Sequence, residues 1–102
     1  MSRLEQLQKL AKAQPEDPFA HFAVGLELME QERYAEALAI FEHTLALDPD
    51  YIAAVFLKAK VEVRLGRKDA AVETLRVGVA TAQRLGDTHT ESKMRQMLEM
   101  LT

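Results

Sequence analysis

The sequence of 102 residues contains no cysteine and no asparagine, and it carries no excess of basic side chains. The lack of cysteine excludes disulfides, thiolate metal ligands and cysteine nucleophiles. Thirteen lysine and arginine residues stand against 16 aspartate and glutamate residues, which leaves a net charge of −3. Because no strongly basic field is available to attract phosphates, nucleic acid is not an expected partner.

Long hydrophobic runs are also missing. No stretch approaches the ~20 consecutive apolar residues that span a bilayer, so no membrane partner is expected. The N-terminal segment 1–14 alternates leucines with charged and amide side chains and therefore does not resemble a signal peptide. The cytoplasm is then the default location. The length and a hydrophobic content of 48% predict a single folded domain over residues 1–102.

Only three prolines and four glycines interrupt the chain, and they divide it at regular places. The stretches between them are rich in alanine, leucine and glutamate, contain no interior proline and show no two-residue alternation, so an all-α fold is predicted. Gly86 is expected to close one helix, and Thr88 with Glu91 is expected to form a capping box at the next. The six predicted helices are 2–13, 18–31, 34–47, 52–65, 68–85 and 88–101.

The chain matches itself when it is shifted by 34 residues. Large residues then fall on large ones and small residues on small ones. The aligned pairs include Pro15 with Pro49, Ala20 with Ala54, Phe22 with Phe56, Gly25 with Ala59, Ala37 with Ala71, and Phe41 with Leu75. A fixed period of this length indicates a helical solenoid, in which each helix pair buries its apolar side against its neighbours.

These residues resemble the motif of the tetratricopeptide repeat family. The matching positions are Val24, Gly25, Leu28, Tyr34, Ala37, Phe41, Asp48 and Pro49 in one repeat, and Ala54, Ala59, Leu65, Gly66, Ala71, Leu75 and Gly78 in the next. The resemblance implies a right-handed solenoid of antiparallel helix hairpins. Its repeats would be 18–51 and 52–85, flanked by an N-terminal capping helix and turn (1–17) and a C-terminal capping helix (86–102).

The second repeat departs from the family pattern at two positions. Lys58 and Glu62 stand where a leucine and a tyrosine are usual. Because they are four residues apart on a helix, we expect them to pair with each other. That edge of helix 52–65 is then expected to be wetter than in other members of the family.

The resemblance further implies that the first helix of each hairpin lines a concave groove, which would bind a peptide or an amphipathic helix of a protein partner. The expected groove residues are Phe19, Phe22, Leu26 and Met29 from the first repeat, and Ala53, Phe56, Lys60, Val63 and Arg64 from the second. Lys60 and Arg64 would favour an acidic residue at one end of the ligand. The family's carboxylate-clamp ligand is not expected, because apolar side chains occupy the matching places and the chain has no asparagine.

Alternatives remain open for this surface. Phe22 and Phe56 could instead belong to the internal core. An apolar patch of this size should be covered, either by a partner, by the chain's own terminal helix, or by a second copy in a homodimer. Met94, Met97 and Met100 near the C-terminus would either pack as core or form an adaptable contact surface.

No residue pattern indicates catalysis or a cofactor. His21, His43 and His89 lie in different predicted elements and show no metal-ligand spacing, so we expect them far apart. The four glycines are dispersed and form no phosphate-binding loop. The sequence therefore predicts a non-catalytic protein-interaction module without a metal or cofactor, or alternatively a self-associating structural unit.

Overall fold

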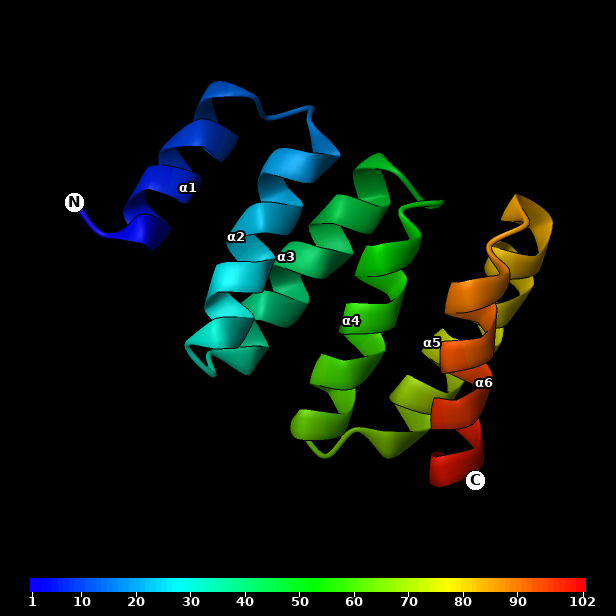
Figure 1. Ribbon diagram of the computed structural model, residues 1–102. Helices are drawn as coiled ribbons and strands as arrows, with labels where there is room; N and C mark the ends of the chain where they lie inside the picture. Colours follow the sequence, from blue (N-terminus) through cyan, green and yellow to red (C-terminus); the bar gives the residue numbers. More distant parts are fainter.

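The computed structural model describes residues 1–102 and consists of six α-helices without a strand (Figure 1). The helices are α1 (Arg3–Ala13), α2 (Pro18–Glu30), α3 (Tyr34–Leu47), α4 (Ile52–Arg64), α5 (Lys68–Leu85) and α6 (Thr88–Leu101). All six predicted helices are confirmed, and each boundary lies within one residue of its predicted position. The chain is therefore all-α, as the composition of the stretches between its prolines and glycines predicts.

Local chemistry explains where these helices begin and end. The Asp17 carboxylate accepts a hydrogen bond from the Phe19 N–H at 3.0 Å, and Pro18 occupies the first position of α2, where its missing N–H costs nothing. At the other end of the chain, Gly86 has φ 73° and closes α5 in the left-handed conformation that glycine adopts without strain.

The start of α6 differs from the prediction. Asp87, and not Thr88, is the N-cap, and its carboxylate accepts a hydrogen bond from the Thr90 N–H at 3.1 Å. The predicted capping box is wrong because the Glu91 carboxylate pairs with Arg95 instead. Hydrogen bonds from Thr90 hold the pKa of Asp87 below its usual value. The stabilisation from this cap is therefore present at neutral pH and is lost as the pH falls through the lowered pKa.

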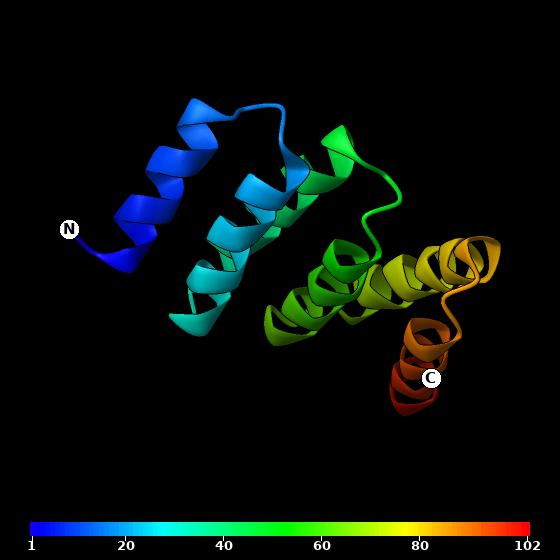
Figure 2. The same cartoon turned by 45° about the horizontal axis from the view of Figure 1, so that its top comes forward.

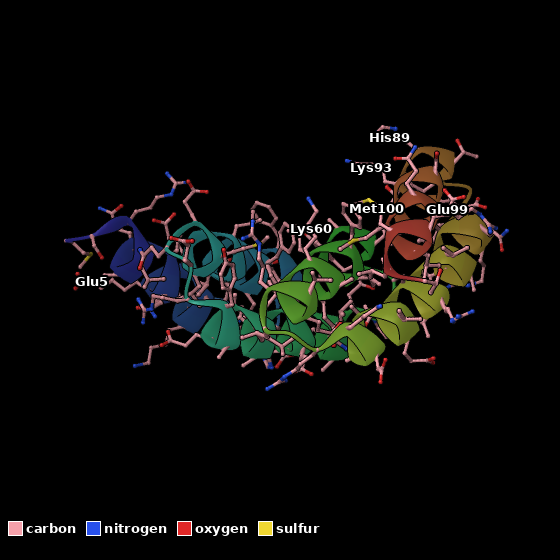
Figure 3. The ribbon with its side chains drawn as sticks, turned by 90° about the horizontal axis from the view of Figure 1, so that it is seen from below. Glu5, Lys60, His89, Lys93, Glu99 and Met100 are labelled. Carbon is pink, nitrogen blue, oxygen red and sulfur yellow. The ribbon has the colours of Figure 1, made fainter.

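The helices stack in one row. α2 with α3 and α4 with α5 form antiparallel hairpins, while α1 packs on α2, and α6 packs on α5 and reaches α4 (Figures 1 and 2). Seen from below, with the row running across the picture, α2, α4 and α6 lie on one side and α3 and α5 on the other (Figure 3). The two ends of the chain lie at opposite ends of a molecule that measures 41 × 28 × 19 Å (Figure 1).

The core repeats with the same period as the sequence. Phe41 of α3 and Leu75 of α5, one repeat apart, are both fully buried, and each is the largest side chain at the centre of its hairpin. Ala37 and Ala71 are buried at the next equivalent positions, where small side chains let the paired helices approach. The predicted solenoid packing is therefore confirmed at the positions that define the repeat.

α2 and α3 approach each other closely at Gly25. A Cβ atom added there would lie 2.5 Å from Cε1 and 2.9 Å from Cδ1 of Phe41, which is too short for any side chain. The absence of a Cβ therefore lets the aromatic ring pack directly on the backbone of α2. Gly78 has the same role for α6, since an added Cβ would meet the Met94 thioether sulfur at 2.6 Å.

Glu62 is buried, contrary to the expectation of a wet edge on α4. Only 5% of its surface is exposed, and its Oε1 atom accepts a hydrogen bond of 2.7 Å from the Thr74 hydroxyl of α5. No ion pair joins Glu62 to Lys58, so the predicted pair is wrong. The Thr74 hydroxyl of α5 lies within hydrogen-bond distance of the Glu62 carboxylate. This hydrogen bond between α4 and α5 takes the place of the ion pair that was expected between Glu62 and Lys58 along α4.

We predict that Gly25→Ala lowers the free energy of unfolding by about 1–2 kcal/mol, because the clash with Phe41 exceeds the gain in helix propensity. The same substitution in a Phe41→Leu background should be neutral or stabilising, since leucine leaves room for the methyl group. Urea denaturation of the four proteins of this cycle measures the coupling. Equal costs of Gly25→Ala in both backgrounds would contradict the close contact.

We also predict that Thr74→Val lowers the free energy of unfolding by about 1–3 kcal/mol, because the buried Glu62 carboxylate loses its hydrogen-bond donor. The double variant Glu62→Leu/Thr74→Val should recover most of that loss, since no polar group is then left unpaired. Thermal unfolding followed by circular dichroism tests both. Strictly additive effects of the two substitutions would show that the hydrogen bond does not couple the helices.

Candidate functional site

The candidate site is the concave face formed by α2, α4 and α6. These helices turn their motif residues toward α3 and α5, as Val24 and Leu28 of α2 show by their burial. On the opposite side of α2 and α4, Leu26 and Lys60 are exposed. Figure 3 shows α6 above the row on this side. Lys60 of α4 projects on the same side, as do His89, Lys93 and Met100 of α6. We call this surface the concave face.

One end of the concave face is apolar. Leu7 and Leu10 of α1 and Phe19 and Ala23 of α2 line a hollow between these two helices. Phe19 is 61% exposed, Leu10 is 53% exposed, and Leu26, seven residues after Phe19 on the same stripe, is 42% exposed. We call Leu7, Leu10, Phe19, Ala23 and Leu26 the apolar end. Three large apolar side chains exposed within one stretch of surface are typical of a docking surface.

Phe22 does not belong to this exposed surface. It is 8% exposed, and its ring centroid lies 5.8 Å from that of Phe41 and 4.9 Å from that of Tyr51. Burial, together with the charges of Asp17 and Asp48, raises the pKa of Tyr51. The side chain of Phe22 therefore seals the junction of α2, α3 and the start of α4. For this residue the structure favours the alternative of an internal core position.

The other end of the concave face is cationic. The Lys60 ammonium of α4 lies 5.0 Å from the ring centroid of Phe56, and the Lys93 ammonium of α6 lies 5.4 Å from the same centroid. The Arg64 guanidinium, one turn after Lys60, lies 5.8 Å from the ring of Tyr34. We call Phe56, Lys60, Arg64 and Lys93 the cationic end. Each contact of this kind is worth about 0.5–1 kcal/mol at an exposed site.

These three cations have no carboxylate partner within the chain. The four ion pairs are Arg3 with Glu27, Arg33 with Glu36, Arg84 with Asp50, and Arg95 with Glu91. Lys60, Arg64 and Lys93 also donate no side-chain hydrogen bond, while an ammonium has three donors to satisfy. Their donors therefore remain available to a ligand.

The remaining predicted groove residues, Met29, Ala53 and Val63, differ in burial, as does Phe56 of the cationic end. Phe56 and Val63 are half-buried, Ala53 is exposed, and Met29 is half-buried and packs against the first core cluster. Phe56 contributes one side to the second core cluster and turns its ring toward Lys60 and Lys93. It therefore belongs both to the core and to the concave face.

The sequence indicates only a capping role for the terminal helices, yet Leu10 of α1 lies beside Phe19 and Lys93 of α6 lies over Phe56. Nothing in the repeat pattern indicates Lys93, because it is the sixth residue of α6 whereas Lys60 is the ninth of α4. Only the packing of α6 against α5 and α4 brings Lys93 to Phe56.

The histidines are closer together than the sequence suggested. The rings of His21 and His43 meet edge to face with centroids 4.4 Å apart, and His21 Nε2 donates to the Pro15 carbonyl at 2.9 Å. The expectation that these residues lie far apart is wrong, because adjacent helices α2 and α3 bring them together. No group of three or more histidine, aspartate or glutamate side chains is arranged to hold a metal ion. None of the helices is long and apolar enough to cross a membrane.

Known proteins support the architecture. The sequence model of the tetratricopeptide repeat matches residues 28–87. No curated protein sequence matches the chain significantly. A tetratricopeptide repeat domain protein from Salinibacter ruber, solved by NMR, is 31% identical with a TM-score of 0.79, and the alignment covers 85% of this chain and 88% of that one.

Two complexes have the same fold at lower identity. PcrH bound to the chaperone-binding region of PopD is 19% identical with a TM-score of 0.90, covering 96% of this chain and 74% of that one. The TPR2B domain of yeast Sti1 in complex with pHsp70 is 18% identical with a TM-score of 0.90, covering 96% and 78%. The repeat spacing, the packing at Gly25 and Phe41, and a sequence match over more than half of the chain lead to one conclusion: this protein belongs to the tetratricopeptide repeat family.

Proposed function

We propose that this protein is a non-catalytic interaction module whose concave face binds a peptide or an amphipathic helix of another protein. The observation that carries the proposal is the apolar end, where Leu10, Phe19 and Leu26 are exposed although each is large and apolar. Burying one such side chain stabilises a complex by roughly 1.5–3 kcal/mol. PcrH and the Sti1 domain, which share the fold, were each solved with a segment of another protein bound.

The chain's own terminal helix leaves the apolar end open. α6 packs on α5 and α4, at the other end of the row from α1 and α2 (Figure 1). Of its methionines, Met94 is fully buried, Met97 is half-buried against the second core cluster, and Met100 is exposed. The methionine stripe is therefore mostly core, and only Met100 is available to a partner.

We also propose that α1 and α6 cap the two repeats 18–51 and 52–85. The outer side of α6 is polar, with Ser92, Arg95, Gln96 and Glu99 around a hollow in which Leu98 is the one apolar residue. Glu5, Gln8, Lys9 and Lys12 similarly occupy the outer side of α1. Polar outer surfaces of this kind prevent further repeats or other copies from stacking on the ends of a solenoid. The concave face is then the surface that remains for a partner.

The two phenylalanines of α2 separate groove from core. We predict that Phe22→Ala lowers the free energy of unfolding by about 3–5 kcal/mol, because it leaves a cavity beside Phe41. Phe19→Ala, at an exposed position, should change stability by less than about 0.5 kcal/mol. Urea denaturation of both variants measures the difference. A large loss of stability in Phe19→Ala would place that residue in the core and remove the main support for the groove.

Binding itself is tested by selecting peptides of about 16 residues from a random displayed library, a length that spans roughly 24 Å as a helix. The wild-type protein should enrich a family of related peptides. The folded variant Phe19→Glu/Leu26→Glu should not enrich them, because charges then occupy the apolar end. Enrichment of the same peptides on both proteins, or on neither, would contradict the proposed function.

The alternative function is self-association through the same apolar end. It predicts that the mass measured by sedimentation equilibrium rises from about 11.5 kDa toward twice that value with concentration, and that Phe19→Glu abolishes the rise. The interaction module predicts a monomer across a hundredfold concentration range. A dimer that Phe19→Glu leaves intact would contradict both explanations of the exposed face.

A further inference from the structure

The concave face combines two different chemistries along its length. The apolar end lies on α1 and α2, whereas the cationic end lies on α4 and α6. The protein as a whole is acidic, with a net charge of −3. Several other lysine and arginine side chains also lack an ion pair, but Lys60 and Lys93 differ from them because both lie over one aromatic ring, that of Phe56.

Each of the three cations lies over an aromatic ring, and all three side chains are exposed. Lys60 and Lys93 approach the same Phe56 ring from two different helices, and both project on the concave side in Figure 3. The contact with the ring uses the charge of the ammonium but none of its hydrogen-bond donors. Both ammonium groups lie within 5.4 Å of one ring centroid, so the carboxylates of one short peptide segment could pair with both without displacing an existing ion pair.

We propose, as an extension of the proposed function, that the partner is a protein segment in two parts: an apolar part that lies over α1 and α2, and an acidic part that lies over α4 and α6. Charge complementarity supports the acidic part, because Lys60 and Lys93 meet at one aromatic ring and neither has a carboxylate partner within the chain. Exposed apolar area determines the other part. Because the apolar end and the cationic end lie at opposite ends of the concave face, the apolar part of the segment would lie toward α1 and its acidic part toward α6.

A uniformly apolar segment would fit this face less well. It would cover the cationic end and remove water from three charges without supplying partners, which is costly even at a partly exposed site. A uniformly acidic segment would leave Phe19 and Leu10 against charged side chains. The two-part segment satisfies both ends, and cation pairing would also speed the encounter of the two proteins.

The composition of the selected peptides tests the inference. Peptides enriched on the wild-type protein should contain an apolar cluster next to a separate cluster of aspartate and glutamate. On Lys60→Glu/Lys93→Glu the apolar cluster should persist while the acidic cluster disappears or changes to lysine and arginine. The matched control Lys9→Glu/Lys68→Glu makes the same change of net charge on exposed residues away from the concave face, and it should select the wild-type peptides.

Affinity measurements give the magnitude. Fluorescence anisotropy with one enriched peptide should show about tenfold weaker binding to Lys60→Glu/Lys93→Glu, because two attractive pairs become repulsive. Lys60→Met/Lys93→Met keeps the apolar stems and should lose less. Replacing the peptide's carboxylates by amides should weaken binding to the wild type and remove its salt dependence. Circular dichroism confirms that each variant is folded.

The outcomes separate this inference from the proposed function. If the wild type enriches purely apolar peptides, or if charge reversal and the matched control bind equally well, the two-part partner is wrong while groove binding stands. If the wild-type protein enriches no peptide that the variant Phe19→Glu/Leu26→Glu does not also enrich, the proposed function is wrong, and the inference that rests on it is wrong as well. A salt-dependent peptide that still binds Phe19→Glu/Leu26→Glu equally well would place the site outside the apolar end and overturn both.

Discussion

The contact between the Phe41 ring and the backbone at Gly25 is the constraint on which the first hairpin depends. Because Gly25 has no Cβ atom, α3 lies close to α2, and Ala37 and Phe41 of α3 are fully buried between the two helices. The orientation of α2 follows from this contact. Once Val24, Gly25 and Leu28 face α3, Phe19 and Leu26 must face away from it, and Phe22 lies between the two sides, where Tyr51 completes its burial.

The second hairpin repeats this geometry with different chemistry. Leu75 takes the place of Phe41, and a carboxylate, Glu62, is buried between α4 and α5. A buried carboxylate is costly unless it is hydrogen-bonded, and the Thr74 hydroxyl supplies that bond. The hairpin therefore gains a directional contact across its interface. On its outward side, Lys60 stands where the first hairpin has Leu26, and Ala53 stands where it has Phe19. The contrast between the two ends of the concave face arises from this difference between two copies of one motif.

The terminal helices complete the concave face as well as the core. α1 adds Leu7 and Leu10 beside Phe19, and α6 adds Lys93 above Phe56, so each end of the face is built by two helices from different parts of the chain. Gly78 makes this possible at the C-terminal end, because Met94 of α6 packs on it directly. α6 therefore both covers the core with Met94 and places the Lys93 ammonium on the surface where a partner would bind.

The sequence by itself determined the six helices, their caps at proline and glycine, the period of 34 residues and the buried positions that recur with it. These features depend on local backbone preferences and on the spacing of apolar residues along one helix. It also identified the stripe that contains Phe19, Phe22 and Leu26. Only the tertiary structure decided that Phe22 is core and Phe19 is surface, that Glu62 bonds to Thr74 and not to Lys58, that His21 meets His43, and that Lys93 reaches Phe56. Periodicity defines the side of a helix on which a residue lies, whereas burial and pairing depend on which other helix approaches that side and how closely.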